Sequence, residues 1–191
     1  MLDLLALDVA CAHPFLTVSI SGDGVRHWSA PPLANGTGLH LDMDANPHRG
    51  LWALQLDNAV RAAREPTILL AEGLACLAIA RWAQLSPPSY VANIAGAYLF
   101  APLSFSPAQA PLLRNLHPGP EVRLPFPSLV IDSRASLSIA RVLEMTDIWG
   151  SQFRDADAMP AEWRATDTVP LALVAADVAA RSGRRRLAAA D

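Results

Sequence analysis

The residues with the clearest chemical potential lie between Thr67 and Trp82. An apolar run at 67–70 leads through a turn of small residues into an apolar segment at 74–83. Strand, tight turn and helix in this order are typical of a nucleophile elbow, G-x-S-x-G, whose central Ser carries the reactive hydroxyl. Here the five positions read Ala71-Glu72-Gly73-Leu74-Ala75. A hydrogen cannot attack a carbonyl, so either the chain does not react through this position or its chemistry sits elsewhere.

Two neighbours of Gly73 could replace the missing nucleophile. Cys76 lies about three residues into the expected helix, and a reactive thiol there would need exposure and a base; otherwise it is a small buried packing residue. Glu72 could serve as a general base for a water molecule. Its carboxylate could instead lie over the free N–H groups at the start of the helix and simply satisfy them.

Other polar groups have a structural interpretation beside each functional one. His27 and Trp28 follow a glycine loop and could contact a ligand or anchor that loop. Trp149 and Trp163 could line a remodelled pocket or belong to the core. A loose polar cluster lacks the tight convergence of a metal site, so we expect no metal there; it comprises His40, Asp42, Asp44 and His48.

Composition narrows the class of protein. The chain has 191 residues, of which 52% are hydrophobic and 17% charged, which predicts one folded domain over 1–191 with a sizeable core. A net charge of -3 argues against a nucleic-acid binder. No apolar run reaches membrane-spanning length, and the N-terminus does not resemble a secretory signal. Two cysteines cannot build a disulfide framework, so we expect a cytoplasmic protein.

Apolar runs and breakers predict alternating strands and helices. Strands are expected at 15–20, 39–43, 67–71, 94–101 and 128–132, and helices at 49–64, 74–83, 136–149 and 168–182. Ser136 is the expected N-cap of the third helix and Gly150 its C-terminal stop. The Pro-rich stretch 102–127 is expected to be a long irregular excursion, and about 184–191 a frayed tail.

This alternation predicts an α/β fold, a three-layer sandwich with a mostly parallel sheet of about five to six strands. Ligands of such sheets bind at the carboxyl ends of the strands. Three segments should meet there: 21–24, 72–74 and 132–136. The expected pocket residues are Gly22, Asp23, Gly24, His27, Trp28, Glu72, Gly73 and Leu74.

Four segments resemble one family, the small serine hydrolases typified by retinoblastoma-binding protein 9 and the bacterial YdeN-type proteins. They are the glycine loop with His-Trp at 22–28, the elbow at 69–78, the strand ending in Ala-Pro at 97–102, and L-P-F-P-S-L-V-I-D-S-R at 124–134. The match spans about residues 13 to 154. The resemblance implies an α/β-hydrolase fold and a catalytic triad in the chain order Ser, acid, His.

The triad positions that the resemblance implies are degenerate. The nucleophile falls on Gly73, and the acid falls on Ser136 or is deleted, because the S-R-x-D-P stretch is two residues short. No His occurs after His117. We therefore expect a non-catalytic relative, without cofactor, that binds a small ligand or protein partner at the former active-site crevice.

Two alternatives stay open. One is an active hydrolase of small ester or acyl substrates that uses Glu72 or Cys76. The other is an interaction module whose recognition surface is the Pro-rich segment 102–127.

Overall fold

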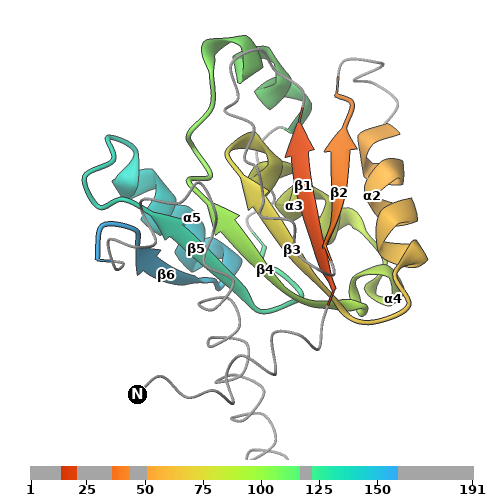
Figure 1. Cartoon of the computed structure of the whole chain (residues 1–191). Coiled ribbons are helices and arrows are strands. Elements are labelled where there is room, and N and C mark those ends of the chain that lie inside the picture. Colours follow the sequence, from red (N-terminus) through yellow and green to blue (C-terminus); the bar gives the residue numbers. More distant parts are fainter. Residues whose placement is uncertain (1–13, 21–35, 44–50, 117–121, 159–191) are drawn as a thin grey trace, which may run out of the picture.

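The computed structural model describes residues 14–20, 36–43, 51–116 and 122–158. Within these ranges six strands form one sheet in the order β2-β1-β3-β4-β5-β6, and every neighbouring pair is parallel (Figure 1). The strands are β1 (Phe15–Ile20), β2 (Gly36–Leu41), β3 (Thr67–Glu72), β4 (Ile94–Phe100), β5 (Ser128–Asp132) and β6 (Gln152–Asp155). The predicted α/β class with a parallel sheet is confirmed.

Three helices pack on one face of this sheet: α2 (Leu51–Ala62), α3 (Leu74–Leu85) and α5 (Ile139–Trp149). In Figure 1, α3 and α5 lie behind the strands. Alternate strand residues such as Leu16, Leu69 and Leu99 join the helices in the main core. The side chains between them in sequence point to the opposite face, because successive strand residues alternate. There they form a second buried cluster: Phe15, Ile68, Leu70, Tyr98, Leu129 and Ile131.

A hydrogen bond ties helices α2 and α3 together within the main core. The indole Nε1 of Trp82, which is 1% exposed, donates to Asp57 Oδ1 at 2.7 Å. The short helix α4 (Pro88–Val91) follows α3, contacts α2 and leads into β4. The elbow helix is therefore anchored along its length and not only at its junction with β3.

The Pro-rich segment is more ordered than its composition suggests. Residues Pro107–Leu116 form a 3-10 helix, η2, which lies at the carboxyl end of the sheet and contacts α3 (Figure 1). Leu112 and Leu116 are buried in the core. The prediction of an irregular excursion was wrong for this part, because tight i to i+3 turns tolerate the interior Pro111 and let the leucines reach the core.

Two further local predictions were wrong. Helix α5 begins at Ile139 and not after Ser136, because Ser136 N donates to Ser133 O and Ile139 N to Ser136 O in successive turns. Strand β6 was not predicted. It is an edge strand whose residues alternate between exposed and half-buried, so it has no apolar run. The predicted stop at Gly150 is confirmed by its left-handed φ of 63°.

Several predictions lie outside the described residues: the glycine loop 21–24, His27, Trp28, Asp44, His48, Trp163, the helix at 168–182 and the tail 184–191. Across the described ranges, no helix combines the length and apolarity that crossing a membrane requires.

Candidate functional site

The turn between β3 and α3 has the backbone of a nucleophile elbow. β3 ends at Glu72, α3 begins at Leu74, and Gly73 between them has φ 57° and ψ -128°. Residues that carry a side chain rarely adopt a positive φ, so this turn suits glycine. Gly73 N donates to Phe100 O at 2.9 Å, and Cys76 N donates to Gly73 O at 3.1 Å. The small flanking residues Ala71 and Ala75 are buried, which lets the helix pack closely on the sheet.

The space above Gly73 is filled by the chain that follows β4. A Cβ built on Gly73 would lie less than 3.0 Å from the backbone carbonyl oxygen of Ser104, closer than real Cβ contacts come. Ser104 is held in this place by a turn, since its N–H donates to Ala101 O at 2.8 Å. Ala101 itself has a φ of 41° and donates from N to Ile131 O at 2.8 Å. A serine side chain at position 73 therefore has no room in this arrangement.

Cys76 is a buried packing residue. Its side chain is 0% exposed, and Sγ donates to Phe100 O at 3.4 Å. Burial raises the pKa of the thiol well above its usual value, and the negative charges of Glu72 and Asp132 raise it further. A reactive cysteine needs the opposite conditions, exposure and a lowered pKa. Cys76 therefore lacks the features of a nucleophile.

Glu72 and Leu74 flank Gly73 but differ in exposure. Glu72 is the last residue of β3 and its side chain is exposed, whereas Leu74 is 1% exposed and packs in the main core. Of the eight expected pocket residues, Glu72, Gly73 and Leu74 lie in the described ranges, and Glu72 is the one whose ionisable group reaches solvent.

An acidic edge extends from Glu72 along the carboxyl ends of the neighbouring strands. Glu72 lies opposite Phe100 in the register of β3 and β4, and Asp132 lies opposite Asp155 in that of β5 and β6. Asp132 is 8% exposed and its Oδ1 accepts from Ser133 N at 2.7 Å. Burial is the main cause that raises the pKa of the Asp132 carboxyl, and the charge of Asp157 adds to it.

Asp155 and Asp157 were missed by sequence reasoning because β6 itself was missed. Asp157 accepts a hydrogen bond from the hydroxyl of Ser133. Asp155 forms an ion pair with Arg134, with Oδ2 to Nε at 3.3 Å, and accepts from Asp157 N at 3.0 Å. The resemblance to the S-R-x-D-P stretch points to this loop, but only the pairing of β6 with β5 brings these carboxylates to it.

The structure places Ser136, the expected position of the triad acid, in a turn. It is half-buried in the turn before α5, where its hydroxyl lies 2.9 Å from that of Ser138. The adjacent Leu137 is fully exposed to solvent. The shortened stretch thus forms a compact turn.

One histidine lies in the described ranges, and it is remote from the elbow. His40 is on the edge strand β2, with β1 between it and β3, and its Nδ1 lies 3.1 Å from Ser19 Oγ. Among residues that the structure describes, no group of three His, Cys, Asp or Glu side chains could hold a metal ion. Trp149 is 3% exposed and belongs to the main core, as its structural interpretation requires.

Comparison with known proteins agrees with this architecture. The sequence of residues 21–159 matches the family model "Serine hydrolase". Among solved structures, a YdeN-like hydrolase from Pectobacterium atrosepticum superposes with a TM-score of 0.55 at 18% identity, over 80% of this chain and 81% of that one.

Two other solved structures are less similar. Esterase 2 of Thermogutta terrifontis, phosphoramylated by tabun, has a TM-score of 0.46 at 10% identity, over 75% of this chain and 71% of that one. RedJ, with a PEG molecule in its active site, has a TM-score of 0.45 at 11% identity, over 87% of this chain and 92% of that one. No curated protein matches the sequence.

The family match covers most of the chain, and it includes the elbow, the strand ending in Ala101-Pro102 and the β5 loop. The parallel sheet and the sharp, positive-φ turn at Gly73 are compatible with this match. The chain therefore belongs to the serine hydrolase family.

Proposed function

We propose that this chain is a non-catalytic member of the serine hydrolase family that binds a small ligand or protein partner beside the former elbow. The observation that carries the proposal is the elbow itself. Gly73 retains the backbone of the nucleophile position, while the Ser104 carbonyl oxygen occupies the space of the missing side chain. A sequence that had only exchanged Ser for Gly would leave that space open for a nucleophile.

The neighbouring groups also favour a loss of chemistry. A serine hydrolase needs a base to take the proton of the nucleophile and donors to stabilise the oxyanion. The sequence contains no His after His117 that could arrive from the late part of the chain. This absence of a late imidazole favours the loss of chemistry.

The charges near the elbow point in the same direction. The Glu72 and Asp132 carboxylates lie close enough to Cys76 to raise the pKa of its thiol. The same negative potential would disfavour an oxyanion that developed above Gly73. A ligand at this edge is therefore expected to be neutral or to carry hydrogen-bond donors.

Labelling with a fluorophosphonate probe tests the proposal. We expect no covalent labelling of the folded protein under conditions in which an active serine hydrolase is labelled stoichiometrically. Stoichiometric labelling of any Ser would contradict the proposal. Thermal-shift screening against neutral acyl compounds would then identify ligands, since a ligand that binds only the folded state raises the Tm.

A second candidate is hydrolysis by a water molecule that Glu72 activates. The observation that favours it is that Glu72, unlike Cys76, is exposed at the end of β3. It predicts turnover of short p-nitrophenyl esters above the buffer rate. This turnover should be lost in Glu72→Gln and kept in Glu65→Gln, which removes an exposed carboxylate two residues before β3 begins. Equal rates in both variants would exclude it.

A third hypothesis, recognition through the segment 102–127, has less support. Leu112, Leu116, Leu124 and Phe126 are buried, and Val122 is the large exposed apolar side chain among the described residues of that segment. Within the described part of this segment, the apolar side chains thus stabilise the fold and do not form an exposed patch.

A further inference from the structure

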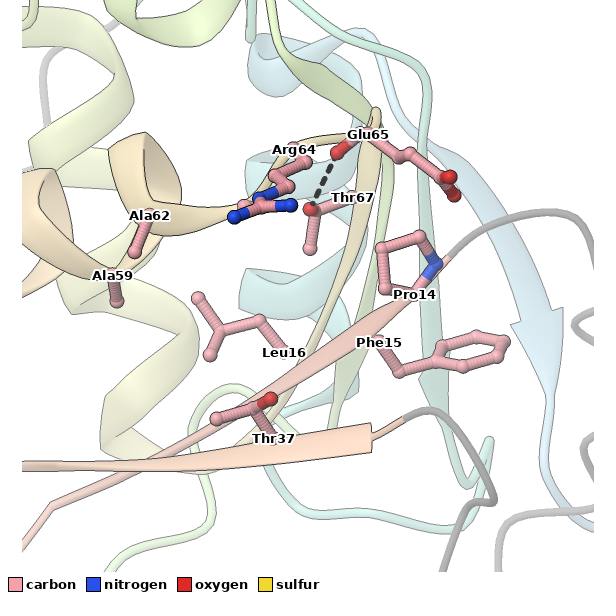
Figure 2. Close-up of a pocket in the computed structure, with 10 residues that line it drawn as sticks. Pro14, Phe15, Leu16, Thr37, Ala59, Ala62, Arg64, Glu65 and Thr67 are labelled. Carbon is pink, nitrogen blue, oxygen red and sulfur yellow. Dashed lines mark hydrogen bonds between the residues drawn. The ribbon is translucent and has the colours of Figure 1, made fainter.

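A cavity lies at the opposite end of the sheet from the elbow. It has a volume of about 550 Å³ and opens where β1, β2 and β3 begin, beside the last turn of α2 (Figure 2). Small-molecule sites in proteins commonly enclose about 300 to 1,000 Å³. The cavity is therefore large enough for a ligand, and the former active-site residues do not take part in it.

The walls of this cavity are mostly apolar. Leu16 points from β1 toward Ala59 and Ala62 of α2 in Figure 2, and Pro14 lies at the start of β1. These alanines keep the helix side open, because a larger side chain at either position would reach into the space. Such walls favour a ligand with an aliphatic body.

Arg64 supplies a positive charge to the apolar cavity. Its guanidinium lies on the cavity side of the α2–β3 connection, whereas the carboxylate of Glu65 extends away from it (Figure 2). Arg64 forms no ion pair with any other residue of the described ranges. An arginine fork that is not already paired matches the two oxygens of a carboxylate.

Some of the nearby backbone carbonyl oxygens, which could otherwise bind the Arg64 guanidinium, already accept hydrogen bonds from other groups. The end of α2 presents backbone carbonyls, which would repel an anion. Asn93 Nδ2 donates to Ala63 O at 3.2 Å and to Glu65 O at 3.4 Å. The hydroxyl of Thr67 also donates to Glu65 O, at 3.1 Å. These bonds occupy two carbonyl oxygens of the α2–β3 connection, Ala63 O and Glu65 O.

We propose that this cavity binds a small amphipathic anion, a monocarboxylate with an aliphatic chain, with its carboxylate on Arg64 and its chain against Leu16 and Ala59. The site is independent of the elbow, so either proposal can fail while the other holds.

Isothermal titration calorimetry with octanoate, octanol and octylammonium tests the assignment. Octanoate should bind the full chain more tightly than octanol, and octylammonium least. Arg64→Gln should lower the affinity for octanoate about fivefold, which is the effect of losing one partly exposed charge pair. The affinity for octanol should not change. Arg61→Gln is the matched control. It removes an exposed charge from the last turn of α2, three residues before Arg64, where the Arg61 guanidinium lies 5.0 Å from the centre of the Tyr90 ring, and it should not alter the affinity for octanoate or octanol.

A second pair of variants tests the place of binding. Ala62→Phe should fill the cavity and abolish binding of octanoate and octanol, while Asn58→Phe, an exposed substitution on α2 that is not in the lining, should not. The proposal is overturned if wild-type protein does not bind octanoate, if Arg64→Gln and Arg61→Gln bind it equally, or if Ala62→Phe binds it normally. Circular dichroism of each variant confirms that it is folded.

Discussion

Replacing Gly73 with serine places a hydroxyl where our proposal puts the lost nucleophile, and we expect this to destabilise the protein without creating activity. The added Cβ would lie less than 3.0 Å from the Ser104 carbonyl oxygen. Because that oxygen belongs to the backbone, it cannot rotate away as a flexible side chain could. The residues from Ala101 to Ser104 would have to move instead.

Two costs add in the Gly73→Ser variant. A side chain at φ 57° and ψ -128° is strained by about 1 to 3 kcal/mol. Forcing the overpacked Ser104 backbone aside costs about 1 to 3 kcal/mol more. The sum is centred on about 4 kcal/mol. For a domain of this length each kcal/mol lowers the Tm by about 2 to 4 °C, so the expected decrease is about 8 to 16 °C.

Thermal denaturation followed by circular dichroism measures this decrease, with Gly38→Ser as the matched control. A Cβ at Gly38 meets no atom within 4 Å and requires no unusual φ, so its effect should stay within about 0.5 kcal/mol. If Gly73→Ser melts within about 2 °C of wild type, the steric argument fails, since that decrease is below the smallest expected one. If it also reacts with a fluorophosphonate, the non-catalytic proposal fails with it.

Other predictions follow from single contacts. In a Cys11→Ser background, Cys76 should react with Ellman's reagent only after unfolding. The pKa of the Cys76 thiol is raised in the folded state, so its contribution to stability should be complete below the pKa of the unfolded thiol and should fall as the pH rises past that value. Rapid labelling of the native protein would contradict its burial. Because the pKa of Asp132 is raised in the folded state, the protein should lose stability as the pH rises through that pKa. Asp132→Asn, whose amide oxygen can still accept from Ser133 N, should therefore reduce the pH dependence of the free energy of urea unfolding between pH 4 and 7 and be more stable than wild type at pH 7. An unchanged pH dependence would count against this. Asp57→Ala should lose about 2 kcal/mol in urea unfolding because the buried Trp82 indole loses its charged acceptor, and an unaltered midpoint would show that water replaces it. Gly150→Ala should cost about 1 kcal/mol for a side chain at φ 63°, with Arg123 moving aside, and a stabilised variant would refute this.

Sequence reasoning succeeded where one local signal dominated. The strands at 15–20 and 128–132 have the predicted bounds because each is a short apolar run. It failed where a distant partner decides the structure. Residues 152–155, three of which are polar, form a strand because they pair with the edge of β5, and Leu112 and Leu116 of η2 are held by packing in the core.

The same distinction between local signals and distant contacts applies to the candidate site. The sequence alone states that position 73 has no hydroxyl and that no imidazole follows His117, because the reactions open to a residue depend on its side chain. Tertiary structure decided that the Ser104 carbonyl fills the space above Gly73, that Cys76 is buried, and that Asp155 joins Asp132 at one edge. These outcomes arise from contacts between segments far apart in the chain, and no local pattern of residue types encodes which distant group will arrive.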